Sequence, residues 1–140
     1  MARTFDVFLD PARGPDRAAL QLAINRLGFK LTLDDGYQPA THQGYLPCTL
    51  EGEDAGVDLR FTADAALPGS AQALSSEQGS RRLCARLKWS GDAREHLSAL
   101  LIVVALAQDF DALVIDPDKG TQPATQDLLK QARALHEDSF

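Results

Sequence analysis

One apolar run in the second half of the chain constrains the fold more than any other feature. After Ser98, every residue from Ala99 to Ala107 is alanine, leucine, isoleucine or valine. Asp92 precedes the run, and Glu95 follows three positions later, which is the spacing of a capping box at a helix start. A helix that is apolar all round must be covered by other elements, and this run is shorter than the roughly 20 residues that cross a bilayer. The sequence therefore predicts a buried, central helix.

Period-two alternation of apolar and polar residues predicts most of the strands. The segments are 4–9, 29–33, 57–62 and 81–89, and a short apolar segment at 112–115 follows the central helix. Helical spacing predicts two further helices, over 15–27 and 121–136. Because one helix separates the first two strands, they are predicted to pair in parallel through a right-handed crossover.

The order β-α-β-β-β-α-β-α predicts an α+β domain with two layers, a mixed sheet with helices on one face and solvent on the other. Residues 1–140 form one domain in this interpretation. Segment 34–56 is expected to be a long loop, or a loop with a short strand near Tyr45. Segment 63–80, rich in Ala, Ser, Gly and Gln, is expected to be mobile, with one or two helical turns over 71–78.

Charge and cysteine content narrow the function classes. The formal net charge of −6 argues against general nucleic-acid binding, which leaves a basic footprint. Cys48 and Cys84 lack CxxC spacing and are too few for a disulfide scaffold. The N-terminus shows no basic segment followed by an apolar one, so no secretory signal is expected. We expect a protein of a bacterial cytoplasm, with no membrane segment.

The acidic residues are concentrated in one part of the chain. Residues 34–64 hold seven carboxylates against Arg60, whereas residues 81–94 hold five cations against Asp92. The acidic segment also contains both tyrosines, and exposed aromatics among charges are typical of protein-binding hot spots. One alternative is that the opposite charges neutralise each other, and another is that the aromatics fold back onto the core. The expected partner-binding residues are Tyr37, Tyr45, Glu51, Glu53, Asp54 and Asp58.

No motif predicts a catalytic centre, a metal site or a cofactor. The segment from Asp116 to Gly120 departs from a calcium loop at Gly120 and at the next residue. The three histidines lack metal-ligand spacing, and Asp34 with Asp35 before Gly36 is typical of a turn. Most of the polar residues are therefore expected to be structural.

Cys84 is the one candidate for reactive chemistry. Strand alternation places it on the solvent face between Arg82 and Arg86, where cations favour the thiolate. A catalytic cysteine also needs a histidine base, and none is close in the sequence. We expect an accessible thiol that is not required for function. A small enzyme or ligand-binding domain that uses Cys84, or a pocket between sheet and loop, stays the alternative to a binding protein.

Two segments resemble a known family. One is a charged strand ending in Lys88-Trp89-Ser90-Gly91-Asp92, followed by the Ala/Leu-rich helix and Leu113-Val114-Ile115-Asp116-Pro117; the other is Gly44-Tyr45-Leu46-Pro47 before an acidic segment. Over about half of the chain they resemble small bacterial immunity proteins of polymorphic toxin systems. The resemblance implies a cytosolic inhibitor that occludes a cognate toxin and has no catalytic residues of its own.

The leading hypothesis is thus a non-enzymatic immunity protein whose acidic loop occludes a basic toxin domain, with charge steering the encounter. The other open alternative is a structural subunit that pairs with itself through the solvent face of the sheet.

Overall fold

The apolar run forms α3 (Ala93–Asp109), the helix around which the other elements pack. Its start is capped by Asp92, whose Oδ1 accepts hydrogen bonds from the backbone N–H groups of Arg94 (2.7 Å) and Glu95 (3.3 Å). The capping box is incomplete, because Glu95 Oε1 accepts from the Ser90 backbone N–H and hydroxyl. Every residue from 97 to 106 is buried, so the prediction of a central helix is confirmed.

The computed structural model describes residues 3–139. Its elements before α3 are β1 (Arg3–Leu9), α1 (Arg17–Arg26), β2 (Leu31–Leu33), β3 (Gln43–Leu46), β4 (Cys48–Leu50), β5 (Glu53–Asp54), β6 (Val57–Thr62), α2 (Ser75–Gln78) and β7 (Leu83–Trp89). After α3 follow β8 (Leu113–Ile115) and α4 (Thr125–Ser139); 3-10 turns η1 (Pro11–Arg13) and η2 (Gly69–Leu74) complete the fold. Within this part of the chain, no helix is both long and apolar enough to span a membrane.

Two sheets are present, and neighbouring strands run antiparallel in both. The larger has the order β3-β6-β7-β1-β8, and the smaller has the order β2-β4-β5. The predicted two-layer α+β class is confirmed. The predicted parallel pairing of the first two strands is wrong, because β2 leaves the large sheet and pairs with β4. The strand expected near Tyr45 is present as β3 and forms one edge of the large sheet.

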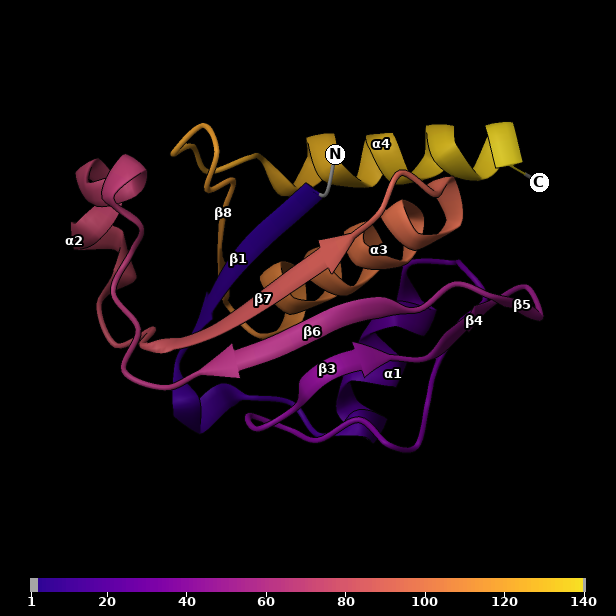
Figure 1. Ribbon diagram of the computed structural model, residues 1–140, viewed down its shortest axis with the longest axis horizontal. Coiled ribbons are helices and arrows are strands. Elements are labelled where there is room, and N and C mark those ends of the chain that lie inside the picture. Colours follow the sequence, from indigo (N-terminus) through magenta and orange to yellow (C-terminus); the bar gives the residue numbers. More distant parts are fainter. Residues whose placement is uncertain (1–2, 140) are drawn as a thin grey trace.

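Helix α3 covers one face of the large sheet, with α1 and α4 packed beside it (Figure 1). Helix α3 contacts β1, β6, β7 and β8 on one side and α1, α4 and β4 on its other sides. The main core contains Leu101 and Val104 together with Ile24, Leu83 and Leu87, as the alternation predicts. The all-round burial of α3 therefore follows from the second sheet as well as from the helices.

The opposite face of the large sheet is only partly open to solvent. A second apolar cluster lies there, where Leu67 and Ala71 pack on Phe8, Cys84 and Leu113, which are strand residues. Leu113 was expected in the main core, but its side chain points to this second cluster. The segment 63–80 thus forms a cover over one end of the sheet, with η2 and α2 as its regular turns (Figure 1).

The cover is attached to the turn that follows β8. The Ser70 hydroxyl donates a hydrogen bond to the Pro117 carbonyl (2.8 Å). Gly120 has a φ of +68°, and a β-carbon at this position would overlap the Ser70 backbone carbonyl. A glycine is therefore required where the turn and the cover meet. The last helix was expected from 121 but begins at Thr125.

Candidate functional site

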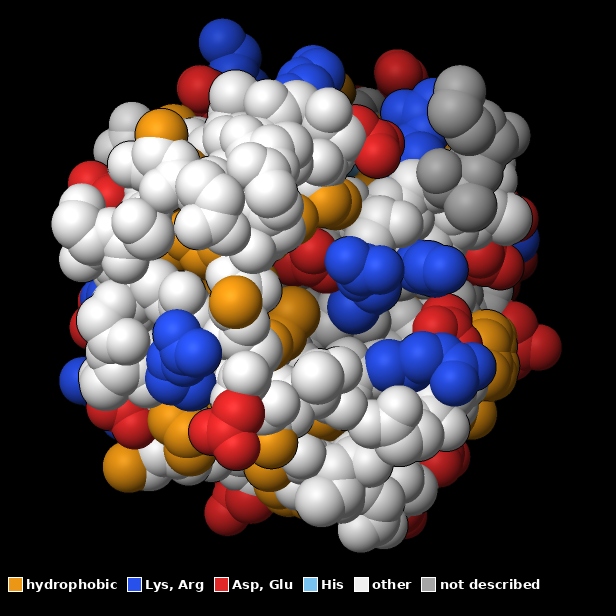
Figure 2. Space-filling view, turned by 60° about the vertical axis from the view of Figure 1, so that its left-hand side comes forward, with side chains coloured by type: hydrophobic (Ala, Val, Ile, Leu, Met, Phe, Trp, Pro, Cys, Tyr) orange, Lys and Arg blue, Asp and Glu red, His pale blue; other side chains and the backbone are white. Residues whose placement is uncertain are grey.

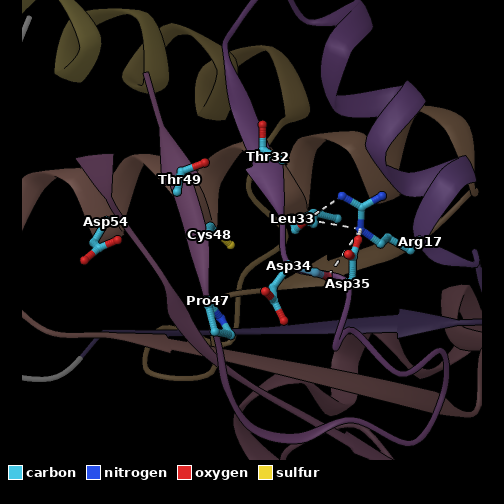
Figure 3. A pocket seen from close by; sticks show the side chains of 9 residues that line it. All are labelled: Arg17, Thr32, Leu33, Asp34, Asp35, Pro47, Cys48, Thr49 and Asp54. Carbon is cyan, nitrogen blue, oxygen red and sulfur yellow. Dashed lines mark hydrogen bonds and ion pairs between the residues drawn. The ribbon is translucent and has the colours of Figure 1, made fainter. Parts of the chain in front are cut away.

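A groove lies on the outer face of the small sheet (Figure 3). Its volume is about 530 Å³. Thr32, Thr49 and Asp54 are partners in register across β2, β4 and β5, and all three are exposed. Because the side chains of neighbouring strands at paired positions share a face, this row forms one wall of the groove. We call it the acidic groove; its lining is Arg17, Thr32, Leu33, Asp34, Asp35, Pro47, Cys48, Thr49 and Asp54.

Arg17, from the start of α1, fixes the opposite wall. Its Nε and Nη2 donate to the Leu33 carbonyl at 3.1 and 2.6 Å. Its Nε also lies 3.3 Å from Oδ1 of Asp35, whose side chain is 96% exposed. An ion pair this exposed contributes little stability. The main role of Arg17 is therefore to hold the end of β2, and the carboxylate of Asp35 stays accessible.

Asp34 and Asp54 supply the other two carboxylates. Asp34 Oδ2 accepts from the Gly36 backbone N–H (2.8 Å), which confirms the predicted turn. Within residues 3–139, Asp54 has no hydrogen-bond or ion-pair partner for its side chain. Figure 3 places Asp54 and Asp35 on opposite sides of the groove. Three carboxylates against one guanidinium, itself bonded to backbone carbonyls, make the groove suited to a cation.

Tyr45 lies on the adjoining surface, joined to the groove through Pro47. Its side chain is 58% exposed on β3, opposite Asp58 of β6. A β-carbon at Gly56 would overlap the Tyr45 hydroxyl, so the absent side chain lets the ring lie against the backbone. A shallow, mostly apolar depression of about 380 Å³ lies beside this ring and includes Trp89. The exposed aromatic expected in the acidic segment is thus present at Tyr45.

Three of the predicted acidic residues have side-chain partners within the chain. Glu51 Oε2 lies 2.7 Å from His136 Nε2, and Glu53 Oε2 lies 2.8 Å from Arg94 Nη2. Asp58 Oδ2 lies 3.0 Å from Arg60 Nε. For Glu53 and Asp58 the alternative of mutual neutralisation applies, and Glu51 is hydrogen-bonded to His136, so all three contribute less to a partner surface than Asp54 does.

Tyr37 corrects the expectation of a second exposed aromatic. It is buried to 4% exposure, and its hydroxyl donates to the Pro15 carbonyl (3.1 Å). Burial, and to a lesser degree the charge of Asp16, raises the pKa of Tyr37 above its ordinary value. This tyrosine therefore caps the core, which is the alternative considered for it, and is not available to a partner.

Cys84 corrects the expectation of an accessible thiolate. The cover encloses it between Phe8 and Ala71, and it is buried. Desolvation by burial, and secondarily the charge of Asp6, raises the pKa of the Cys84 thiol to about 12. The nearby Arg86 lowers it less than burial raises it. The thiol is thus neutral at physiological pH, and although Cys84 lines a hollow beside the cover, only 8% of the residue is exposed.

The histidines lie apart. His42 stacks near Tyr37, His96 stacks on Trp89 at 4.9 Å between ring centroids, and His136 meets Phe29 edge-on. Burial, and secondarily the charge of Arg3, lowers the pKa of His96. Among the described residues, no three His, Cys, Asp or Glu side chains are placed to hold a metal ion.

The acidic groove was only partly visible in the sequence. The concentration of acidic residues identified Asp54, whereas Asp34 and Asp35 were expected only to form a turn. The positions of Thr49 and Arg17 were missed, since they depend on long-range pairing of β2 with β4 and on the docking of α1. Comparison of the chain with protein-family models, with curated proteins and with solved structures finds no match, so the function is argued from this geometry.

Proposed function

We propose that this protein is a non-enzymatic binding protein whose acidic groove receives a cationic side chain of a protein partner. The observation that carries the proposal is the carboxylate of Asp54, which faces the groove with no partner among the described residues. Asp35 adds a second accessible carboxylate on the opposite wall. A lysine or arginine of the partner would gain two charge-assisted hydrogen bonds there.

Tyr45 supplies the second part of the interface. Large aromatic side chains at interfaces are enriched among the residues that dominate binding energy. Tyr45 is exposed next to an apolar depression, whose rim carries Asp58, Lys88 and Glu95. An apolar centre with a charged rim is the usual anatomy of a protein interface.

Within this class we infer an immunity protein that acts in a bacterial cytoplasm and neutralises a cognate toxin by occluding a basic active site. Two features support the inference: the sequence resemblance to immunity proteins of polymorphic toxin systems, and the net charge of −6. A negative inhibitor and a positive target attract each other at long range, which speeds their encounter.

The test begins by capturing the partner from the native host with the purified chain and measuring binding kinetics at two ionic strengths. Asp54→Lys should slow association and flatten its salt dependence, because the groove would lose its unpaired carboxylate. Glu77→Lys is the matched control: it makes the same charge change on α2, which lies at the opposite end of the molecule from β5 (Figure 1). Tyr45→Ala should weaken binding by at least about 2 kcal/mol, mainly through faster dissociation.

Equal effects of Asp54→Lys and Glu77→Lys would show that the groove is not the interface. The toxin inference needs a separate measurement: the captured partner is expressed alone and together with this chain, and growth is followed. A partner that is harmless when expressed alone would contradict the immunity role and leave only the binding role.

A further inference from the structure

The uncovered part of the large sheet carries three cations on adjacent strands. Arg60, Arg86 and Asp6 are in register across β6, β7 and β1, and Lys88 lies two residues beyond Arg86 on the same face. Next to this row the cover lies over Cys84. A hollow of about 460 Å³ is lined by the cover on one side and by the cations on the other. Figure 2 shows Lys and Arg side chains gathered beside this hollowed part of the surface.

Asp6 holds the central cation in place. Its carboxylate is nearly enclosed, with the side chain 2% exposed, and it accepts from Arg86 Nε (2.7 Å) and Nη2 (2.9 Å). This two-point contact uses one edge of the guanidinium. The hydrogen bonding that Arg86 donates to Asp6, opposed by desolvation, raises the pKa of Arg86. The cation is therefore both permanently charged and fixed in orientation.

Arg86 retains hydrogen-bonding capacity on the side away from Asp6. A guanidinium has five N–H donors, and Asp6 occupies two of them, so the Nη1 group and the second Nη2 proton remain. Within residues 3–139, Arg86 has no other side-chain partner. Its side chain is 47% exposed, so one Nη1 proton and the remaining Nη2 proton, which point the same way, can meet a ligand from solvent. A pair of parallel N–H groups matches the two oxygens of a carboxylate.

Lys88 adds a cation that is not neutralised internally. It is exposed, and among the described residues it has no ion-pair partner. Its cross-strand neighbour Asp58 is bonded to Arg60 instead. Arg60 lies directly opposite Arg86, and each of these like charges is paired with its own carboxylate, Asp58 and Asp6. In a chain with a net charge of −6, the lining of this hollow has three cations and one carboxylate.

The wall formed by the cover is apolar. It consists of Ala65, Ala66 and Pro68, and Phe8 lies at the base. Small-molecule sites are commonly hollows of about 300–1,000 Å³ that combine apolar walls with a few fixed polar groups. This hollow has that size and composition, and its cations lie on one side.

We propose that the hollow binds a small organic carboxylate, with the carboxylate between the free donors of Arg86 and the Lys88 ammonium group and the apolar part against Ala66 and Pro68. The site is separate from the acidic groove, which is lined by residues of α1, the small sheet and the adjoining loops. The hollow does, however, share Lys88 with the rim of the apolar depression beside Tyr45. The proposed site gives the chain a second binding activity, for a small organic acid.

The test is an NMR titration of the isotope-labelled chain with phenylacetate at constant ionic strength. Saturable shifts are expected for backbone amides of residues 84–88 and 65–68. Phenylacetamide has the same shape without the charge and should produce no saturable shift. Lys88→Glu should raise the dissociation constant at least about tenfold, whereas Lys130→Glu, the same charge change at an exposed position on α4, should change it less than about twofold.

Lys88 is chosen because replacing Arg86 would leave Asp6 buried and unpaired, which destabilises the fold. Equal binding of phenylacetate by the Lys88→Glu variant, or equal shifts with phenylacetamide, would overturn the proposal. A capped Gly-Glu-Phe-Gly peptide is titrated in parallel. Binding of the peptide without binding of phenylacetate would overturn the assignment to a small ligand and point to an acidic protein segment.

Discussion

Replacing Ser98 by alanine should make the protein more stable. Ser98 is the one polar residue in the buried part of α3, and its side chain has no exposure to solvent. Within residues 3–139 its Oγ has no hydrogen-bond partner. A hydroxyl that loses water on folding without gaining another partner costs about 1–3 kcal/mol. Removing it leaves the neighbouring apolar contacts in place.

The size of the effect follows from three contributions. Relief of the unpaired hydroxyl contributes about 1–3 kcal/mol, and the higher helix propensity of alanine contributes about 0.5 kcal/mol. Lost packing around the missing oxygen opposes these by about 1 kcal/mol. The free energy of unfolding should rise by about 0.5–2.5 kcal/mol. With an unfolding entropy of about 2.1 cal/mol/K per residue over 140 residues, the melting temperature rises by roughly 2–8 °C.

Urea unfolding followed by circular dichroism measures the change, with an unchanged slope as the sign that only stability is altered. Ser76→Ala, at an exposed helical position of α2, is the matched control and should change the stability by less than about 0.5 kcal/mol. If Ser98→Ala lowers the free energy of unfolding by more than about 0.5 kcal/mol, the hydroxyl is hydrogen-bonded in solution and the reasoning is wrong.

Three further predictions concern the core, the thiols and the buried tyrosine. Leu101→Ala should cost about 2–5 kcal/mol in urea unfolding, while Leu22→Ala, where the side chain is 52% exposed, should cost less than about 1 kcal/mol. Burial raises the pKa of Cys48 and Cys84 from 9.0 to about 12. The stability that their neutral thiols contribute is therefore complete below pH 9 and is lost as the pH rises toward 12, which urea unfolding across this range measures. Labelling of the native protein by a thiol reagent at pH 8 should also be slow. Tyr37→Phe should cost about 1 kcal/mol through the lost hydrogen bond to a backbone carbonyl, and no loss of stability would show that this bond contributes nothing.

The elements that local pattern determines were predictable from the sequence. Helix α3 followed from its apolar run and from Asp92, and β6 and β7 followed from period-two alternation. The pairing of β2 was not predictable, because a short alternating segment fits any sheet edge equally well. Its place in the second sheet depends on contacts with β4 that are distant in sequence.

The residues of the candidate site were likewise predictable only where local sequence determines their environment. Composition identified Asp54 and Tyr45 as exposed residues of the acidic segment, but it could not distinguish Tyr45 from Tyr37, which packs in the main core and donates its hydroxyl to the Pro15 carbonyl. The burial of Cys84 had a signal that was missed. Leu67, Ala71 and Leu74 recur at helical spacing in the segment 63–80, which is the pattern of a helical face that needs a surface to cover.

The contact between Gly120 and the Ser70 carbonyl links the chemistry of the thiol to a residue that does not touch it. Any side chain at Gly120 would push the cover away from the turn, and the cover is what shields Cys84. Gly120→Ala should therefore expose the sulfur to alkylating agents and peroxide under native conditions, measured by mass spectrometry. The protection of this cysteine from oxidation therefore depends on Gly120, in the turn after β8. Oxidation of the thiol would then detect a displaced cover before any loss of the fold could be measured.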